Sequence, residues 1–389
     1  MNKAYILDYR RTPVGGYLSN LSKLSALDLG RLTVENLVMN FDKNLIEKGY
    51  VGNVLSAGLG QNIGRQIFYS SGINIPAITL SNVCGSGMQA IIEGTKSIMV
   101  GENDCVIAGG VESMSNSPYL QKDIRVGNKY GNIELIDSML HDGLTDAYTK
   151  EHMGKLTENL AEKLEISRKE QDEYAKKSYE KARNAWNNKK FSDEVFPITI
   201  KDRKKDILIT TDEEVNKVED LNKLDNLKTV FKKNGTITAG NASTLSDGAC
   251  FLILVSEKFL EENNLKAKAE IIDFNLISGL PEEFPIIPID SINKLCSKHN
   301  IKPNDIDYFE INEAFAVVPI MCHRNLNIPY DKINVYGGAI ALGHPIGCSG
   351  SRIVATLLNI LRNENKSLGC ASICNGGGGA TSLLIKNVV

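Results

Sequence analysis

The sequence lacks an excess of charge of either sign. Its 389 residues include 44 lysines and arginines against 47 aspartates and glutamates, which leaves a net charge of −3. With a pI near 6.1, the chain has no basic footprint of the kind that binds the phosphates of nucleic acids. We therefore expect no nucleic-acid partner.

Long apolar runs are absent as well. No stretch approaches the roughly 20 apolar residues that a membrane-spanning helix requires. The first residues, Met1 to Asp8, form only a short strand-like apolar run and do not resemble a secretory signal. These absences favour a cytoplasmic protein with no membrane partner.

The cysteines lack the spacing of metal ligands. No CxxC pair and no Cys/His ligand pattern is present, and structural zinc sites depend on such clusters. We expect no metal site and a reducing compartment. The eight cysteines are scattered at positions 84, 105, 250, 296, 322, 348, 370 and 374.

Cys84 is present in an informative context. It ends the apolar, β-branched run 78–83 and precedes Gly85, Gly87 and an apolar helix expected to reach about Val100. A helix start carries free backbone N–H groups and partial positive charge, which favour a thiolate and can hold an oxyanion beside it. The alternative is a buried structural cysteine. The glycines favour the first interpretation because they let a ligand approach the backbone closely.

Two segments near the C-terminus complete a possible site. His344 lies in the glycine-dense loop 337–347, and Cys374 ends a short strand before the glycines 376–379. A histidine near Cys84 could remove its proton, because imidazole titrates near pH ~6.5. Cys374 could act as a separate acid or base. Taken alone, His344 would be interpreted as an ordinary loop histidine and Cys374 as a core cysteine. Together with Cys84, they indicate an acyl-transfer site.

Six motifs carry a resemblance to a known family. They are RTPVG (11–15), NVCGSG (82–87), AGNAS (239–243), NEAF (312–315), GHP (343–345) and CNGGG (374–378). In this order and at this spacing, the chain resembles the thiolases, and specifically the acetyl-CoA acetyltransferases, over essentially its whole length.

An internal repeat predicts an α/β fold with two similar halves, each with a sheet covered by helices. The segments 84–87 and 348–351 each begin a helix that leads to a strand, at 104–110 and 370–374 respectively. Further helices are expected at Leu27–Met39, Ser167–Lys189 and Ile289–Lys298. The resemblance implies the thiolase fold, a five-layer αβαβα arrangement. It assigns residues 1–117 and 243–267 to the N-terminal half, and 268–389 to the C-terminal half. Residues 118–242 would be a loop domain that covers coenzyme A and carries a tetramer-forming segment.

The resemblance implies a ping-pong Claisen condensation of two acetyl-CoA to acetoacetyl-CoA and CoA, and the reverse thiolysis. His344 would take the proton of Cys84, which would then carry the acetyl group. Cys374 would remove a proton from the methyl group of the second acetyl-CoA. His344 and a water held by Asn312 would stabilise the enolate oxygen, and the backbone N–H groups of Cys84 and Gly376 would form a second oxyanion hole. Without the resemblance, Asn312 would be interpreted as a helix N-cap.

The resemblance also implies a binding site for coenzyme A thioesters, which are substrates, and no bound cofactor. Ser243 would contact the pantetheine arm, and Met153 would close the acyl pocket behind a short chain. The remaining binding positions are Leu144, His152, Phe231, Ala239, Ala314 and Phe315. A homotetramer is implied as well.

Three positions depart from the family pattern. Lys217 follows Asn216 where an arginine usually holds the adenine end, Phe284 replaces a pocket methionine, and Asn375 follows Cys374 where an apolar residue is common. The alternative functions are a degradative 3-ketoacyl-CoA thiolase of broader chain length and a catalytically silent acyl-CoA binder. A ketoacyl synthase is disfavoured by the second cysteine.

Overall fold

The computed structural model describes residues 2–201, 203 and 205–388 of the chain. Its main sheet follows the strand order β12-β13-β14-β11-β1-β10-β5-β3-β4, with β2 paired to β10. Its strands are β1 (Ala4–Arg11), β2 (Gly15–Gly16), β3 (Lys48–Gly52), β4 (Ala77–Leu80), β5 (Cys105–Ser113), β10 (Ser246–Ser256), β11 (Ala269–Ser278), β12 (Tyr308–Ile311), β13 (Leu368–Asn375) and β14 (Gly379–Asn387). The α-helices are α1 (Ala26–Leu37), α2 (Ile63–Ser70), α3 (Ser86–Met99), α4 (Met153–Lys163), α5 (Arg168–Asn187), α6 (Glu257–Glu262), α7 (Ile287–Lys298), α8 (Val317–Leu326), α9 (Ala339–Leu342) and α10 (Ile346–Asn363).

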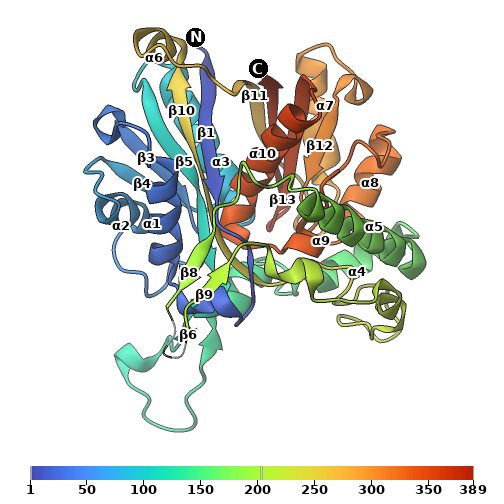
Figure 1. The fold of residues 1–389 in the computed structure, drawn as a ribbon. Helices are drawn as coiled ribbons and strands as arrows, with labels where there is room; N and C mark the ends of the chain where they lie inside the picture. Colours follow the sequence, from blue (N-terminus) through green and yellow to red (C-terminus); the bar gives the residue numbers. More distant parts are fainter. Residues whose placement is uncertain (1, 202, 204, 389) are drawn as a thin grey trace.

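Helices and strands form five layers. Helices α3 and α10 pack against each other in the centre and contact strands of both halves. Helices α1 and α2 cover the outer face of the N-terminal strands, and α7 covers the outer face of the C-terminal strands (Figure 1). The expected α/β arrangement is therefore present. None of the helices in the described part of the chain is long and apolar enough to span a bilayer.

The strands of the two halves form one continuous path, whereas the sequence predicts a separate sheet for each half. The connection is short, because β1 pairs with β11 only through Ala4, Tyr5 and Ile6. Beyond this point the β1–β10 ladder shifts register between Ile6 and Asp8, and the β11–β14 ladder shifts between Ile271 and Asp273. Bulges bend and twist strands, so the two parts of the sheet separate beyond them and leave space for α3 and α10.

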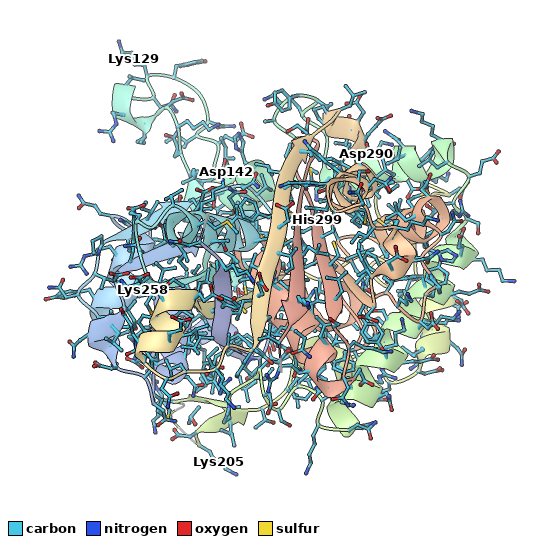
Figure 2. The ribbon with its side chains drawn as sticks, turned by 90° about the horizontal axis from the view of Figure 1, so that it is seen from above. Lys129, Asp142, Lys205, Lys258, Asp290 and His299 are labelled. Atoms are coloured by element: carbon cyan, nitrogen blue, oxygen red, sulfur yellow. The ribbon has the colours of Figure 1, made fainter. Side chains whose placement is uncertain are left out.

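Residues 118–242 connect the two strands β5 and β10. They contain the hairpin of β6 (Tyr119–Leu120) and β7 (Ile136–Asp137), a π-helical turn at Met139–Leu144, helices α4 and α5, and the hairpin of β8 (Ile198–Ile200) and β9 (Ile207–Ile209). The segment between β6 and β7 projects from the body, with Lys129 near its end (Figure 2). Val126 and Tyr130 in this segment are exposed.

A buried ion cluster attaches this connecting segment to the N-terminal strand. Arg11 lies on β1 and bonds Glu194 at 2.7 Å and both oxygens of Asp212 at 2.7 and 3.0 Å. All three side chains are almost fully buried. The bidentate geometry offsets part of the cost of burying these charges, while Oε2 of Glu194 has no partner among the described residues.

Candidate active site

Cys84 occupies a strained turn between β4 and α3. Val83 before it has φ +46°, which is unusual for a β-branched residue. The turn is held by Ser86, whose hydroxyl donates to the carbonyl of Val83 at 2.6 Å and accepts from the N–H of Asn82 at 2.8 Å. Helix α3 begins at Ser86, so Cys84 lies directly before the helix N-terminus. Such strain is concentrated at functional sites in proteins.

Cys84 is protonated in the resting protein. Burial raises the pKa of the Cys84 thiol to about 12, although backbone N–H groups of Gly376 and Cys84 itself act in the opposite direction. The expectation of a thiolate is therefore wrong for the resting state, because desolvation of the sulfur outweighs the backbone N–H groups that face it. The sulfur requires a base.

His344 is neutral and held in one tautomer. Burial lowers the pKa of His344 to about 3, with a smaller contribution from the positive charge of Arg352. Nδ1 lies 2.6 Å from the hydroxyl of Ser349, and that hydroxyl donates its proton to the carbonyl of Pro345 at 2.9 Å. Nδ1 must therefore be the donor, which leaves the lone pair on Nε2. Neutral Nε2 is the form that can accept a proton.

Asn312 lies beside His344, behind the cavity wall. Its Nδ2 is 3.5 Å from Nε2 of His344, and its side chain is 0 % exposed. Its Oδ1 is buried without a partner in the described part of the chain. Helix α8 begins only at Val317, with Ala316 at the cap position. The N-cap interpretation of Asn312 is therefore wrong, because the chain between β12 and α8 forms an irregular loop.

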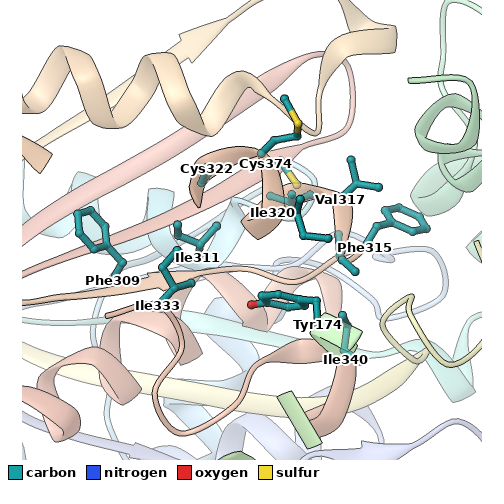
Figure 3. Close-up of a cluster of buried hydrophobic side chains, with 14 of the residues drawn as sticks. Tyr174, Phe309, Ile311, Phe315, Val317, Ile320, Cys322, Ile333, Ile340 and Cys374 are labelled. Carbon is teal, nitrogen blue, oxygen red and sulfur yellow. The ribbon is translucent and has the colours of Figure 1, made fainter. Parts of the chain in front are cut away.

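Cys374 lies at the end of β13 and is 1 % exposed. Its pKa is raised well above the ordinary value, mainly by burial and also by the proximity of Cys84. Figure 3 shows Cys374 near Cys322, in a cluster of buried side chains from the C-terminal half and the connecting segment. Both reactive cysteines are therefore thiols at rest.

One cavity of about 550 Å³ brings the predicted residues together. All of them line it except Asn312: Cys84, Leu144, His152, Met153, Phe231, Ala239, Ser243, Ala314, Phe315, His344, Cys374 and Gly376. These residues come from both halves and from the connecting segment. Among the described residues, no group of three or more His, Cys, Asp or Glu is placed to hold a metal ion.

Aromatic rings form one wall of the cavity. His152 stacks on Phe231 with ring centroids 4.8 Å apart, and Phe315 packs edge-on against both Phe231 and Phe284 at 6.4 Å. His152 also caps helix α4, because its Nδ1 accepts from the N–H of Gly154 at 3.0 Å. Gly154 leaves space for the ring, since a Cβ there would lie 2.2 Å from Phe231.

The other binding positions are placed by backbone pairing between two loops. The N–H and the hydroxyl of Ser243 both donate to the carbonyl of Ala314, at 3.0 and 3.1 Å. The N–H of Ala316 donates to the carbonyl of Asn241 at 2.9 Å. The AGNAS motif (239–243) and the NEAF motif (312–315), which are distant in the chain, therefore form a common rim of the cavity.

Two of the positions that depart from the family pattern contact the cavity. Phe284 is nearly fully buried, and Lys217 is exposed with its Nζ 2.9 Å from Glu214. The third, Asn375, packs against the turn after Cys84: its Oδ1 lies 2.4 Å from the position of a Cβ on Gly85. That oxygen has no partner within the described residues.

Two groups of residues at the site were not predicted from the sequence. Ser349, five residues after His344, orients the imidazole. The only sign of this role in the sequence was the position of its hydroxyl, about one turn into the helix that follows His344. Apolar lining residues such as Met114, Leu140 and Ile346 were also missed, because apolar residues in loops carry no chemical signature.

Comparisons with known proteins identify the family of the chain. Residues 4–258 match the model of the thiolase N-terminal domain, and residues 265–387 match that of the thiolase C-terminal domain. The chain is 41% identical to the acetyl-CoA acetyltransferase of Schizosaccharomyces pombe over 99% of each chain. It is 42% identical to the mitochondrial acetyl-CoA acetyltransferase of Mus musculus, over 100% of this chain and 92% of the other.

Two solved structures are similar along the whole chain. The Acat5 thiolase from Ascaris suum in complex with coenzyme A superposes with a TM-score of 0.94 at 39% identity, over 99% of this chain and 100% of that one. The Bacillus anthracis acetyl-CoA acetyltransferase gives 0.97 at 34% identity, over 100% and 99%. From its two family domains, its relatives and its fold, the chain belongs to the thiolase family.

Proposed function

We propose that this protein is an acetyl-CoA acetyltransferase, which condenses two acetyl-CoA to acetoacetyl-CoA and CoA and catalyses the reverse thiolysis. One observation carries the proposal: Cys84, His344 and Cys374 line a single, largely apolar cavity in which the histidine is neutral and both cysteines are thiols. The names of the relatives support the substrate class.

Acylation begins with a proton transfer. Nε2 of His344 takes the proton of Cys84, and the sulfur attacks the thioester carbonyl of acetyl-CoA. The backbone N–H groups of Cys84 and Gly376, which point to the sulfur region, then donate to the developing oxyanion. Cys374 gives its proton to the departing CoA sulfur. The acetyl group remains on Cys84, with His344 positively charged and Cys374 negatively charged.

Condensation uses this charged pair. The Cys374 thiolate removes a proton from the methyl group of the second acetyl-CoA. Protonated His344 and a water on the unpartnered Oδ1 of Asn312 stabilise the enolate oxygen. The enolate carbon attacks the acetyl carbonyl, the Cys84 sulfur leaves, and it recovers its proton from His344. Each catalytic group is returned to its resting state.

Three further assignments belong to the proposal. Residues 118–242 act as the loop domain that covers coenzyme A, and the projecting segment between β6 and β7 joins four copies of the chain into a homotetramer. Lys217, at the cavity rim and paired with Glu214, is the residue that could supply positive charge where the family carries an arginine for the adenine end. The enzyme acts in the cytoplasm.

Intact-protein mass spectrometry and product analysis test the proposal. We expect acetyl-CoA alone to place one acetyl group on Cys84 and to yield acetoacetyl-CoA. Cys84→Ala should abolish both acylation and condensation. Cys374→Ala should permit slow acylation without condensation, and condensation at the wild-type rate in this variant would refute the assigned base.

Thiolysis of 3-ketoacyl-CoA substrates from four to sixteen carbons separates the alternatives. A preference for acetoacetyl-CoA is expected. Comparable rates on long chains would indicate a degradative 3-ketoacyl-CoA thiolase, and inactivity on all substrates would indicate a silent acyl-CoA binder.

A further inference from the structure

His344 lies between the end of one helix and the start of the next. Helix α9 ends at Leu342 two residues before it, and helix α10 begins at Ile346 two residues after it. The first N–H groups of a helix have no partner within the helix. In both helices one of these groups is satisfied by a fully buried carboxylate from elsewhere in the chain: Ile340 N–H donates to Glu313 at 3.1 Å, and Gly347 N–H donates to Glu112 at 3.0 Å.

Glu112 comes from the N-terminal half, at the end of β5. Its Oε1 accepts from Nδ2 of Asn53 at 2.8 Å and from the N–H of Leu55 at 3.2 Å. Its Oε2 accepts from the N–H groups of Val54 and Gly347, both at 3.0 Å. The carboxylate therefore joins residues 53–55 of one half to the segment after His344 in the other. Four N–H donors face it, which only a group with two acceptor oxygens can satisfy.

Glu313 forms the corresponding contact on the other side of His344. Its Oε1 accepts from the hydroxyl of Tyr174 and from Nδ2 of Asn334, both at 2.8 Å. Its Oε2 accepts from the hydroxyl of Ser178 at 2.7 Å and from the N–H of Ile340. The carboxylate thus ties α9 to α5 and to Asn334.

Glu313 also fixes the neighbouring Asn312. Asn334 exchanges two hydrogen bonds of 2.8 Å with the backbone of Ile311, the residue before Asn312. Nδ2 of Asn312 in turn lies 3.5 Å from Nε2 of His344. The Glu313 carboxylate therefore bonds the backbone before His344 directly, at Ile340, and holds the backbone before Asn312 indirectly, through the side chain of Asn334.

We infer that Glu112 and Glu313 are positioning residues, which hold the backbone on the two sides of His344 and so keep its Nε2 in the geometry for proton transfer. The inference rests on the proposed role of His344 as the base. The imidazole itself is held through Nδ1 by Ser349, which belongs to α10 and moves with it. A displacement of either helix start is thus transmitted to the ring, and about 1 Å of misplacement can cost about 100-fold in rate.

Glu112→Gln and Glu313→Gln test the inference. An amide keeps the size of the side chain but replaces one acceptor oxygen with a donor, so one backbone N–H loses its partner. The readouts are the rate of Cys84 alkylation by iodoacetamide, followed on the Cys84 peptide by mass spectrometry, and the kcat and KM of acetoacetyl-CoA thiolysis. We expect alkylation and kcat to fall about 10- to 100-fold. KM should stay within about twofold, because neither carboxylate lines the cavity.

The charge of Glu112 makes the alkylation test more stringent. Burial raises the pKa of Glu112 to about 7, so alkylation is followed at a pH at least about one unit above that value, where the group is charged. There its negative charge raises the pKa of Cys84, and removing the charge alone would ease thiol ionisation and speed alkylation. Slower alkylation in Glu112→Gln therefore reports the loss of positioning. Asp273→Asn is the matched control, since this carboxylate bonds Phe274, Lys298 and His299 instead. It should lower the melting temperature without changing alkylation.

His344→Ala distinguishes a failure of the proposed base from a failure of the proposed positioning role. If it alkylates at the wild-type rate, the proposed base is wrong. If it is slow but both Gln variants behave like Asp273→Asn, the positioning role is overturned. Should the Gln variants fail to fold, Asn53→Ala and Ser178→Ala each remove one bond to a carboxylate that keeps its other three. A fall of about threefold in alkylation at unchanged KM is expected for them, and wild-type rates in both would refute the inference.

Discussion

Met153 is the side chain that should set the length of the acyl group. It is the first residue of α4 and is 9 % exposed. Its Cε lies 3.7 Å from where a Cβ on Gly376 would be, next to the proposed oxyanion hole. Met153→Ala removes the thioether arm and opens space for about two methylene groups. At about 0.8 kcal/mol for each buried methylene, the gain for a six-carbon over a four-carbon substrate is about 1.6 kcal/mol.

This free energy corresponds to a rise of about 15-fold in the ratio of kcat/KM for the six-carbon and four-carbon 3-ketoacyl-CoA. The assay is thiolysis of both substrates by wild type and variant under the same conditions. Met88→Ala is the matched control: Met88 is fully buried in α3 and does not line the cavity. Both changes should destabilise the fold by about 2–5 kcal/mol. A ratio within twofold of wild type in active Met153→Ala would refute the reasoning.

Three further changes have defined outcomes. His344→Asn should make the free energy of unfolding less sensitive to acid. The pKa of His344 is about 3 in the folded protein and ~6.5 in the unfolded chain. Between these two pH values, His344 binds a proton only in the unfolded chain. Wild type should lose about 1.4 kcal/mol per pH unit more than the variant as the pH falls through this range, read from urea midpoints. Gly154→Ala places a Cβ 2.2 Å from Phe231 and should raise the KM for CoA by disrupting the His152–Phe231 stack; an unchanged KM would exclude that stack from binding. Arg11→Ala leaves Glu194 and Asp212 buried without their shared counter-ion, so the free energy of unfolding should fall by about 3–5 kcal/mol in denaturant titrations. A loss below about 1 kcal/mol would contradict the cluster's role.

The local elements could be predicted from the sequence. Helices expected at Leu27–Met39 and Ile289–Lys298 are observed at Ala26–Leu37 and Ile287–Lys298, because both carry a continuous apolar face. The helix expected at Ser167–Lys189 begins where Ser167 accepts from the N–H of Glu170. Such signals lie within a few residues of one another.

Features that depend on burial or on distant contacts could not be predicted. The protonation of Cys84 follows from its surroundings in the folded protein, whose desolvation of the sulfur outweighs the backbone N–H groups that favour its charge. The partners of Glu112 and Glu313 lie up to 235 residues away in the chain. The motifs located the reactive groups because their residue types are chemically distinctive, whereas the groups that orient them are ordinary serines and glutamates.

The position of β1 in the sheet has a consequence for biosynthesis. Although β1 is the first strand to leave the ribosome, both of its neighbours, β10 and β11, come from residues beyond 245. The pairing of Ala4 with Ser256 brings together residues that are separated by more than half of the chain. High contact order slows folding, and unpaired apolar strands are prone to aggregation. The nascent N-terminal half must therefore keep an open sheet edge until β10 is translated. A chaperone that shields strand edges would benefit the chain most during this interval.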